Sequence, residues 1–243
     1  MAVLLLRLAG PMQSWGTQSR FTIRDTGMEP SKSGVIGLIC AALGRPRSEP
    51  VDDLAKLKMG VRVDKEGKMQ VDFHTALDVA KASEDKKKER DTVVSTRYYL
   101  ADADFLVGLE SDDFNLLEKI HNALANPHWT LYLGRKSFVP SVPVQIPDGL
   151  KEKDSLESAL KCYSWPRLFA KVPKENERPK ELRLVLETPF GEGNEVRCDQ
   201  PVGAAFGYSL KHNFTTRYVK TIFHPLGKKD EKGNDGIPIR QEE

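Results

Sequence analysis

The order of apolar segments in the first half of the chain is the feature that most constrains its fold. Residues 2–8 form a short apolar run that is typical of a buried strand. A helix is predicted over residues 34–43, with Ser31 or Ser33 as its N-cap and Gly44 just beyond its last residue. The chain therefore begins with a strand followed by a helix.

The same kinds of element return further along the chain. An alternating segment at residues 59–63 follows the first helix, and residues 101–110 predict another strand. Residues 114–125 carry apolar side chains along one helical face, and residues 130–134 predict a closing strand. If the charged excursion at residues 71–99 is set aside, the order is β-α-β-β-α-β, which is the ferredoxin-like order.

The excursion at residues 71–99 predicts a long β-hairpin inserted between the second and third strands of that order. Residues 84–91, near its apex, hold four cations and four acids, and a solvated tip is the simpler interpretation of such a balanced run. Arg97 and Tyr98 lie at its returning base, and side chains of these types can stack on unpaired bases.

The pattern weakens after residue 140, although two strands and a helix are still legible there. We therefore expect an α+β fold with three parts. These are a ferredoxin-like N-terminal domain at residues 1–140 with the β-hairpin inserted at residues 71–99, a smaller β-rich C-terminal region at residues 141–226, and a mobile polar tail at residues 227–243.

The composition excludes several classes of protein. Hydrophobic residues make up 39% and charged residues 30% of the 243 residues, as in a folded globular chain. No apolar run is long enough to span a membrane or to serve as a secretory signal, so we expect a cytoplasmic location and no membrane partner. The three cysteines have no metal-ligand spacing, so we expect no disulfide framework, metal site or cofactor.

The formal net charge of +2 conceals an uneven distribution. Residues 1–47 hold six Lys or Arg against two acids, whereas residues 101–113 hold five acids and no base. Basic residues beside aromatic ones are what an RNA- or phosphate-binding surface requires. Ordinary surface charge is the alternative interpretation.

Two short segments could bind an anion. Ser31, Lys32 and Ser33 precede a helix rich in small residues, where hydroxyls, an ammonium and unpaired backbone N–H groups could cradle a phosphate. Plain N-capping is the alternative, and the P-loop pattern is absent. A later loop has two adjacent cations, Arg135 and Lys136, which could grip a nucleic-acid backbone or could simply be solvated.

One set of residues could support catalysis. Tyr218, Lys220 and His224 alternate along a predicted strand and could face the same side of it. Such residues can cleave RNA without a metal, because His or Tyr can take a 2′-hydroxyl proton while Lys stabilises the phosphorane. Three such residues also occur on one strand by chance, so a metal-independent endoribonuclease is the alternative hypothesis.

Five motifs, in order along residues 3–140, resemble the CasD proteins, which are the type I-E branch of the fifth Cas family in the RAMP superfamily. The motifs are LRLAGPMQSWG at 6–16, PSKSGVIGLICAALG at 30–44, FHT at 73–75, RYYLADADF at 97–105 and LYLGRKS at 131–137. DQP at 199–201 and FTTRYV at 214–219 extend the resemblance more weakly.

The resemblance implies an RRM-related fold whose hairpin is a thumb, and a non-catalytic subunit of a type I-E Cascade complex in antiviral defence. Such a subunit caps the 5′ repeat-derived handle of the CRISPR RNA (crRNA) and docks the backbone subunit CasC and the large subunit CasA, with target DNA reached only through the assembled complex. The residues that would contact the handle are Gln13, Trp15, Arg20, Arg24, Ser31, Lys32, Ser33, Arg97, Tyr98, Gly134, Arg135, Lys136 and Ser137. Relatives in another subtype cut repeat RNA themselves, which keeps Tyr218, Lys220 and His224 as the alternative.

Overall fold

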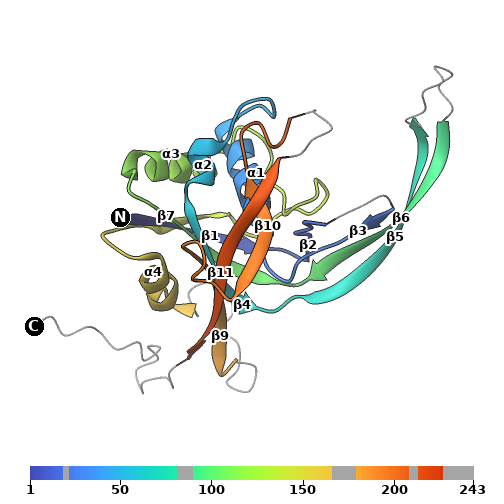
Figure 1. Ribbon diagram of the computed structural model, residues 1–243. Helices are drawn as coiled ribbons and strands as arrows, with labels where there is room; N and C mark the ends of the chain where they lie inside the picture. The colour runs from blue at the N-terminus through green and yellow to red at the C-terminus, as the bar shows by residue number, and fades with distance from the viewer. Residues whose placement is uncertain (19–21, 81–89, 166–178, 208–212, 227–243) are drawn as a thin grey trace, which may run out of the picture.

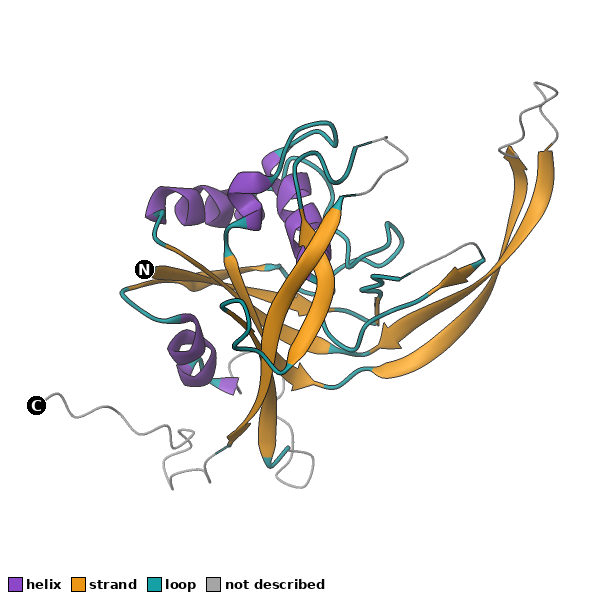
Figure 2. Ribbon diagram, viewed as in Figure 1, coloured by secondary structure: helices purple, strands orange, loops and turns teal. Residues whose placement is uncertain are grey.

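A seven-stranded antiparallel sheet forms the centre of the protein, as a computed structural model shows (Figures 1 and 2). The structure describes residues 1–18, 22–80, 90–165, 179–207 and 213–226. The order across the sheet is β10-β11-β9-β4-β7-β1-β8. Its strands are β1 (Ala2–Ala9), β4 (Lys58–Lys65), β7 (Asp104–Ser111), β8 (Gln145–Glu152), β9 (Glu181–Thr188), β10 (Glu195–Pro201) and β11 (Phe214–Pro225).

The longer helices begin at a side-chain cap, and for α1 this cap is Ser31, one of the two serines expected from the sequence. Ser31, Asp113 and Ser155 each accept a hydrogen bond from a backbone N–H three residues further on. The helices that the structure describes are α1 (Lys32–Leu43), α2 (Asp52–Ala55), α3 (Phe114–Ala125) and α4 (Leu156–Cys162).

The apolar run of β1 is buried on both faces of the sheet. Leu4, Leu6 and Leu8 belong to the core beneath α1 and α3. Val3 and Leu5 belong to a second core beneath α4, which lies on the opposite side of the sheet in Figure 1. A strand covered on both faces has no solvent side to make polar, which explains the continuous run in the sequence.

Two crossover connections build the first half of the sheet. α1 links β1 to β4, and α3 links β7 to β8. The four strands lie in the order β8-β1-β7-β4, and each is antiparallel to its neighbour. α1 and α3 pack against each other over the same core.

The strand predicted at residues 130–134 is wrong, and β8 takes its place beside β1. Leu133 lies in a turn, where its N–H donates to the Phe138 carbonyl at 2.7 Å. The sequence conceals β8 because it contains Pro147 and Gly149, which are poor strand formers in general. Proline is tolerated here because β8 is the edge strand of the sheet.

A long hairpin projects from the body of the protein (Figure 1). Its strands are β5 (Lys68–Ala80) and β6 (Arg90–Ala101), which pair antiparallel from Lys68↔Ala101 to Ala80↔Arg90. Two short strands, β2 (Met12–Gln13) and β3 (Ile23–Arg24), also pair with β6. The apex cations of residues 86–88 lie outside the described residues.

The strands of the C-terminal region extend the same sheet. β9 pairs with β4, and β11 and β10 follow outward. Residue 140, where a domain boundary is expected, therefore does not separate two sheets, since strands from both sides of it share this one. The tail at residues 227–243 lies outside the described residues. No helix of the described chain is long and apolar enough to cross a membrane.

Candidate functional site

The loop after β1 and the loop after α3 are in close contact at Gly134. The Ser14 N–H donates to the Leu133 carbonyl at 3.1 Å, and Gly134 has a φ of 89°. A Cβ on Gly134 would lie 1.7 Å from the Ser14 carbonyl oxygen, so only glycine fits. Because Arg135 and Lys136 follow directly, this contact determines where their side chains leave the loop.

Gln13 and Trp15 lie beneath this loop and not on the surface. The Gln13 Nε2 donates to the carbonyls of Leu8 at 3.1 Å and Ala103 at 2.8 Å. The Trp15 Nε1 donates to the Gln13 Oε1 at 3.1 Å, and only 1% of Trp15 is exposed. The buried amide of Gln13 is therefore satisfied internally, so its predicted contact with RNA is not supported by its position.

Two backbone N–H groups at the N-terminus of α1 already donate hydrogen bonds to side chains of the protein. Ser31 Oγ accepts from the Gly34 N–H at 3.3 Å, which is the capping interpretation of this turn. The Lys32 N–H donates to the Asp199 carboxylate at 2.7 Å, and the Lys32 ammonium donates to Glu187 at 2.9 Å. Lys32 is buried and does not reach the surface, so the structure does not support its predicted phosphate contact.

Four charged residues form what we call the buried ion-pair network, namely Lys32, Glu187, Asp199 and Arg217. Arg217 donates to both Asp199 oxygens, at 2.6 and 2.9 Å, and lies 3.7 Å from Glu187. Burial lowers the pKa of Lys32, while the neighbouring Glu187 carboxylate opposes that effect. The network ties the start of α1 to β9, β10 and β11.

Three arginines converge at the base of the hairpin, and we call Arg24, Arg97 and Arg135 the arginine cluster. Arg24 and Arg97 are register partners where β3 pairs with β6. The Arg135 Nη2 donates to the Tyr98 carbonyl at 2.9 Å and to the Arg24 carbonyl at 3.4 Å. The Arg97 Nε donates to Ser95 Oγ at 2.9 Å. One loop and two strands thus hold three cations together.

The arginine cluster carries an excess of positive charge. Burial lowers the pKa of Arg135, and the cations Arg97 and Arg24 lower it further, while Asp72 and Asp25 act in the opposite direction. The carboxylate of Asp25 also accepts hydrogen bonds from two backbone N–H groups of its own loop. A bound anion would relieve the repulsion among the arginines.

A cavity of about 300 Å³ opens beside the arginine cluster. The predicted site residues that line it are Trp15, Arg24, Ser31, Ser33, Gly134 and Arg135. Lys136 and Ser137 are exposed on the same loop as Arg135. Tyr98 alternates with Arg97 on β6, so its side chain lies on the other face of the hairpin. Arg20 lies outside the described residues.

Sequence reasoning missed two aromatic residues of this cavity. Phe206 and Phe214 line it from the C-terminal region, 6.3 Å apart between ring centroids. They come from far along the chain, in the part where apolar periodicity is weak. The aromatic residue at the start of the FTTRYV motif was the one available signal.

The alternative catalytic residues are not brought together. Tyr218 and His224 are six residues apart on β11, which is roughly 20 Å along a strand. Lys220 forms an ion pair with Glu157 at 3.2 Å. Burial lowers the pKa of His224, as do the nearby cations of Lys161 and Arg62. The three groups cannot contact one phosphodiester in this arrangement.

The described residues contain no group of three or more His, Cys, Asp or Glu side chains that could hold a metal ion. The cysteines Cys40, Cys162 and Cys198 are all free thiols. The arginines and aromatic side chains that line the cavity can bind an anion and stack on a base, which are the two elements of single-stranded nucleic-acid recognition.

Comparisons with known proteins point to one family. A family model described as CRISPR-associated protein (Cas_Cas5) matches residues 3–222. The CRISPR system Cascade subunit CasD of Escherichia coli strain K12 is 36% identical over 175 residues, which is 66% of this chain and 76% of that protein.

Solved structures agree with this match. One described as a crystal structure of a Cas protein is 44% identical, with a TM-score of 0.72, over 97% of this chain and 100% of that one. A chain from a CRISPR RNA-guided surveillance complex is 35% identical, with a TM-score of 0.71, over 92% of this chain and 90% of that one. Both similarities extend through the C-terminal region.

Proposed function

The chain belongs to the CRISPR-associated Cas5 family, and from that premise we propose that it is a non-catalytic, RNA-binding subunit of a type I-E Cascade surveillance complex. It caps the 5′ repeat-derived handle of the crRNA. The arginine cluster beside a partly aromatic cavity is the observation that carries this proposal. The similarity to a Cascade subunit and to a chain of an RNA-guided surveillance complex supports it.

The handle would bind with its backbone across the arginine cluster. Arg24 and Arg135 line the cavity, and Lys136 extends the same basic surface on an exposed loop. Arginine suits phosphate because its planar guanidinium donates several hydrogen bonds in a fixed geometry. The serine hydroxyl of Ser33 lies in the same cavity and offers a neutral polar contact.

The fold supports the same assignment. The strand order β8-β1-β7-β4, with α1 and α3 over one face, supports a ferredoxin-like, RRM-related domain. The β5–β6 hairpin would be the thumb of that domain. Strands β9, β10 and β11 would form its smaller C-terminal extension.

The hairpin offers a surface for the backbone subunit CasC. Met69, Val71 and Phe73 share one face of β5, and Phe73 is 72% exposed. Large apolar groups gathered on a projecting hairpin are typical of a protein-docking surface. CasA would dock elsewhere, and target DNA would be reached only through the assembled complex.

The experiment that tests this proposal measures binding of handle-bearing RNA against salt. Arg135→Ala combined with Lys136→Ala removes about two phosphate contacts, so affinity should fall and the log–log salt slope should become shallower by about 1.4. Lys119→Ala with Lys180→Ala is the matched control, since both lysines are exposed and lie on other elements. Binding and slope that stay unchanged in the Arg135/Lys136 variant would remove this loop from the site.

The endoribonuclease alternative has its own test. The separation of Tyr218 from His224 predicts no site-specific cut when the purified protein is incubated with repeat RNA in EDTA. A single product that disappears in His224→Ala would establish the enzyme instead. Product that persists in His224→Ala would indicate a contaminating nuclease.

A further inference from the structure

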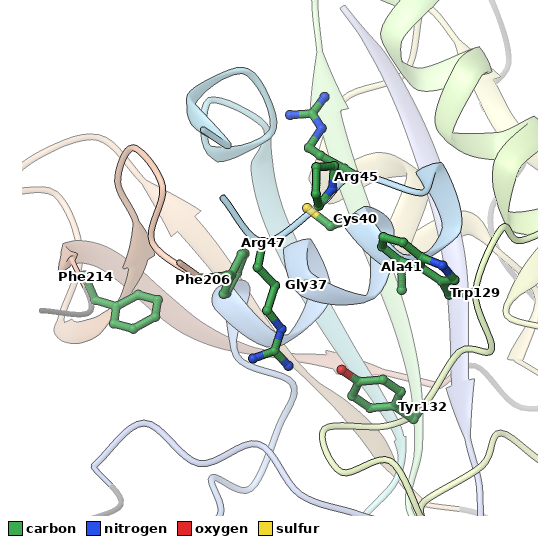
Figure 3. Close-up of a pocket in the computed structure, with 10 residues that line it drawn as sticks. Gly37, Cys40, Ala41, Arg45, Arg47, Trp129, Tyr132, Phe206 and Phe214 are labelled. Carbon is green, nitrogen blue, oxygen red and sulfur yellow. The ribbon is translucent and has the colours of Figure 1, made fainter. Parts of the chain in front are cut away.

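A second cavity, of about 350 Å³, lies beside α1 (Figure 3). Phe206 and Phe214 line both cavities. On α1 the first cavity touches Gly34, and the second touches Gly37 and Ala41. These small residues follow at helical spacing, so one face of α1 borders both cavities, with the Phe206 ring over Gly37 between them.

The walls of this second cavity, which we call the aromatic pocket, are aromatic rings. Trp129, Tyr132 and Phe206 line it, and the backbone N–H of Trp129 donates to the Ala41 carbonyl at 3.1 Å, which holds the backbone of Trp129 against α1. Trp129 is 46% exposed, and its ring meets the neighbouring His128 ring at 69°, so these two rings do not stack. The protein thus presents a partly open aromatic wall beside α1.

The charge of the aromatic pocket is positive. Arg45 is committed elsewhere, with Asp53 at 2.6 Å and Glu49 at 3.2 Å, and Figure 3 shows its guanidinium pointing away from the pocket. The Arg47 side chain instead extends past Gly37 toward Tyr132 (Figure 3). Within the described residues, no carboxylate lines the pocket.

The floor of the aromatic pocket adds no negative charge. Burial raises the pKa of the Cys40 thiol to about 11, so Cys40 stays neutral at physiological pH. The pocket volume is at the lower end of the roughly 300–1,000 Å³ of small-ligand sites. A flat aromatic group joined to an anion is the chemistry that these surroundings fit.

We propose that the aromatic pocket holds one unpaired nucleobase of the bound RNA, with Arg47 contacting its phosphate. The inference rests on the proposed function, since the base belongs to the strand whose backbone crosses the arginine cluster. Stacking on aromatic rings accepts any base, so the pocket contributes affinity and fixes the path of the strand. A protein side chain is the weaker candidate, because it would leave the Arg47 charge without a partner.

The test uses the full chain with handle RNA that carries 2-aminopurine at one position at a time. Stacking quenches the fluorescence of 2-aminopurine. At one position of the RNA, the fluorescence should therefore be weaker in the wild-type complex than in the Trp129→Ala complex. Trp129→Ala should also weaken RNA binding on the order of tenfold. Arg47→Ala should make the log–log salt dependence of binding shallower by about 0.7. Trp129→Phe keeps an aromatic ring and should retain the quenching. Phe223→Ala is the matched control, since Phe223 is 58% exposed on β11.

The outcomes separate this inference from the proposed function. If the RNA binds with its expected salt slope but no position is quenched through Trp129, the aromatic pocket is not a base site and the proposed function stands. If Trp129→Ala leaves RNA binding and quenching intact but prevents recovery of a partner subunit, the pocket docks protein and the inference is wrong. If handle RNA does not bind at all, both fail.

Discussion

At the scale of single residues, the structure separates residues that build the site from residues that face a ligand. Gln13 and Lys32 lie in conspicuous motifs, yet each is buried with a partner inside the protein. Trp15 is buried as well, but it lines the cavity. Arg24 and Arg135 remain at the cavity. Residue type and spacing could predict the polar cluster, but they could not show which side chains turn inward.

Gly134 gives a test at this scale. Gly134→Ala should destabilise the protein, because its φ of 89° disfavours a side chain and a Cβ would clash with the Ser14 carbonyl. Gly191→Ala is the matched control, since Gly191 has a φ of 82° with no atom within 4 Å of the added Cβ. In urea unfolding, Gly191→Ala should cost about 1–2 kcal/mol and Gly134→Ala clearly more. Equal losses would contradict a tight contact between the two loops.

At the scale of elements, the buried ion-pair network explains why the N-terminus of α1 supports the site and does not itself bind a ligand. The Asp199 carboxylate accepts a hydrogen bond from a backbone N–H of α1 that could otherwise bind an external anion. Asp199 lies on β10, far from α1 in the sequence. The helix and its N-cap could be predicted from the sequence, because both depend on residues close together in the chain. It does not show the network, which depends on how β9, β10 and β11 pack.

Breaking this network should be costly for stability. Glu187→Ala leaves the buried ammonium of Lys32 without its carboxylate, so the free energy of unfolding should fall by about 3–5 kcal/mol. Lys161→Ala breaks a partly exposed pair with Glu157 and should cost at most about 1 kcal/mol. Chemical denaturation of both variants measures the difference, and a loss near the control value would mean that the network does not anchor α1.

The elements that sequence reasoning placed wrongly share a physical cause. Residues 130–134 alternate like a strand but close a turn at Gly134, whereas β8 is irregular and still occupies the sheet edge. Edge strands have one free side, so they tolerate proline and weak patterning. The order of the other core strands was predictable because their apolar runs are buried on one or both faces.

At the scale of the whole molecule, the acidic stretch of the sequence and the arginine cluster lie in different surroundings. Two of the five acids at residues 101–113 are buried and held inside the protein, since Asp104 pairs with Arg7 and Glu110 accepts from the Leu156 N–H, whereas Asp102, Asp112 and Asp113 are exposed. Arg24 and Arg135 of the arginine cluster line a cavity. A net charge of +2 is therefore compatible with a strongly basic local site.

The central claim is that the 5′ handle of the crRNA lies across the arginine cluster, and photo-crosslinking in the assembled complex tests it most directly. Handle RNA with 4-thiouridine at successive positions should crosslink to peptides containing residues 95–100 and 133–138, which form the base of the hairpin and the loop of Arg135. Arg97→Ala with Arg135→Ala should weaken these crosslinks, while Lys119→Ala should not. Handle crosslinks that instead map to β11 around Tyr218–His224 would contradict the account.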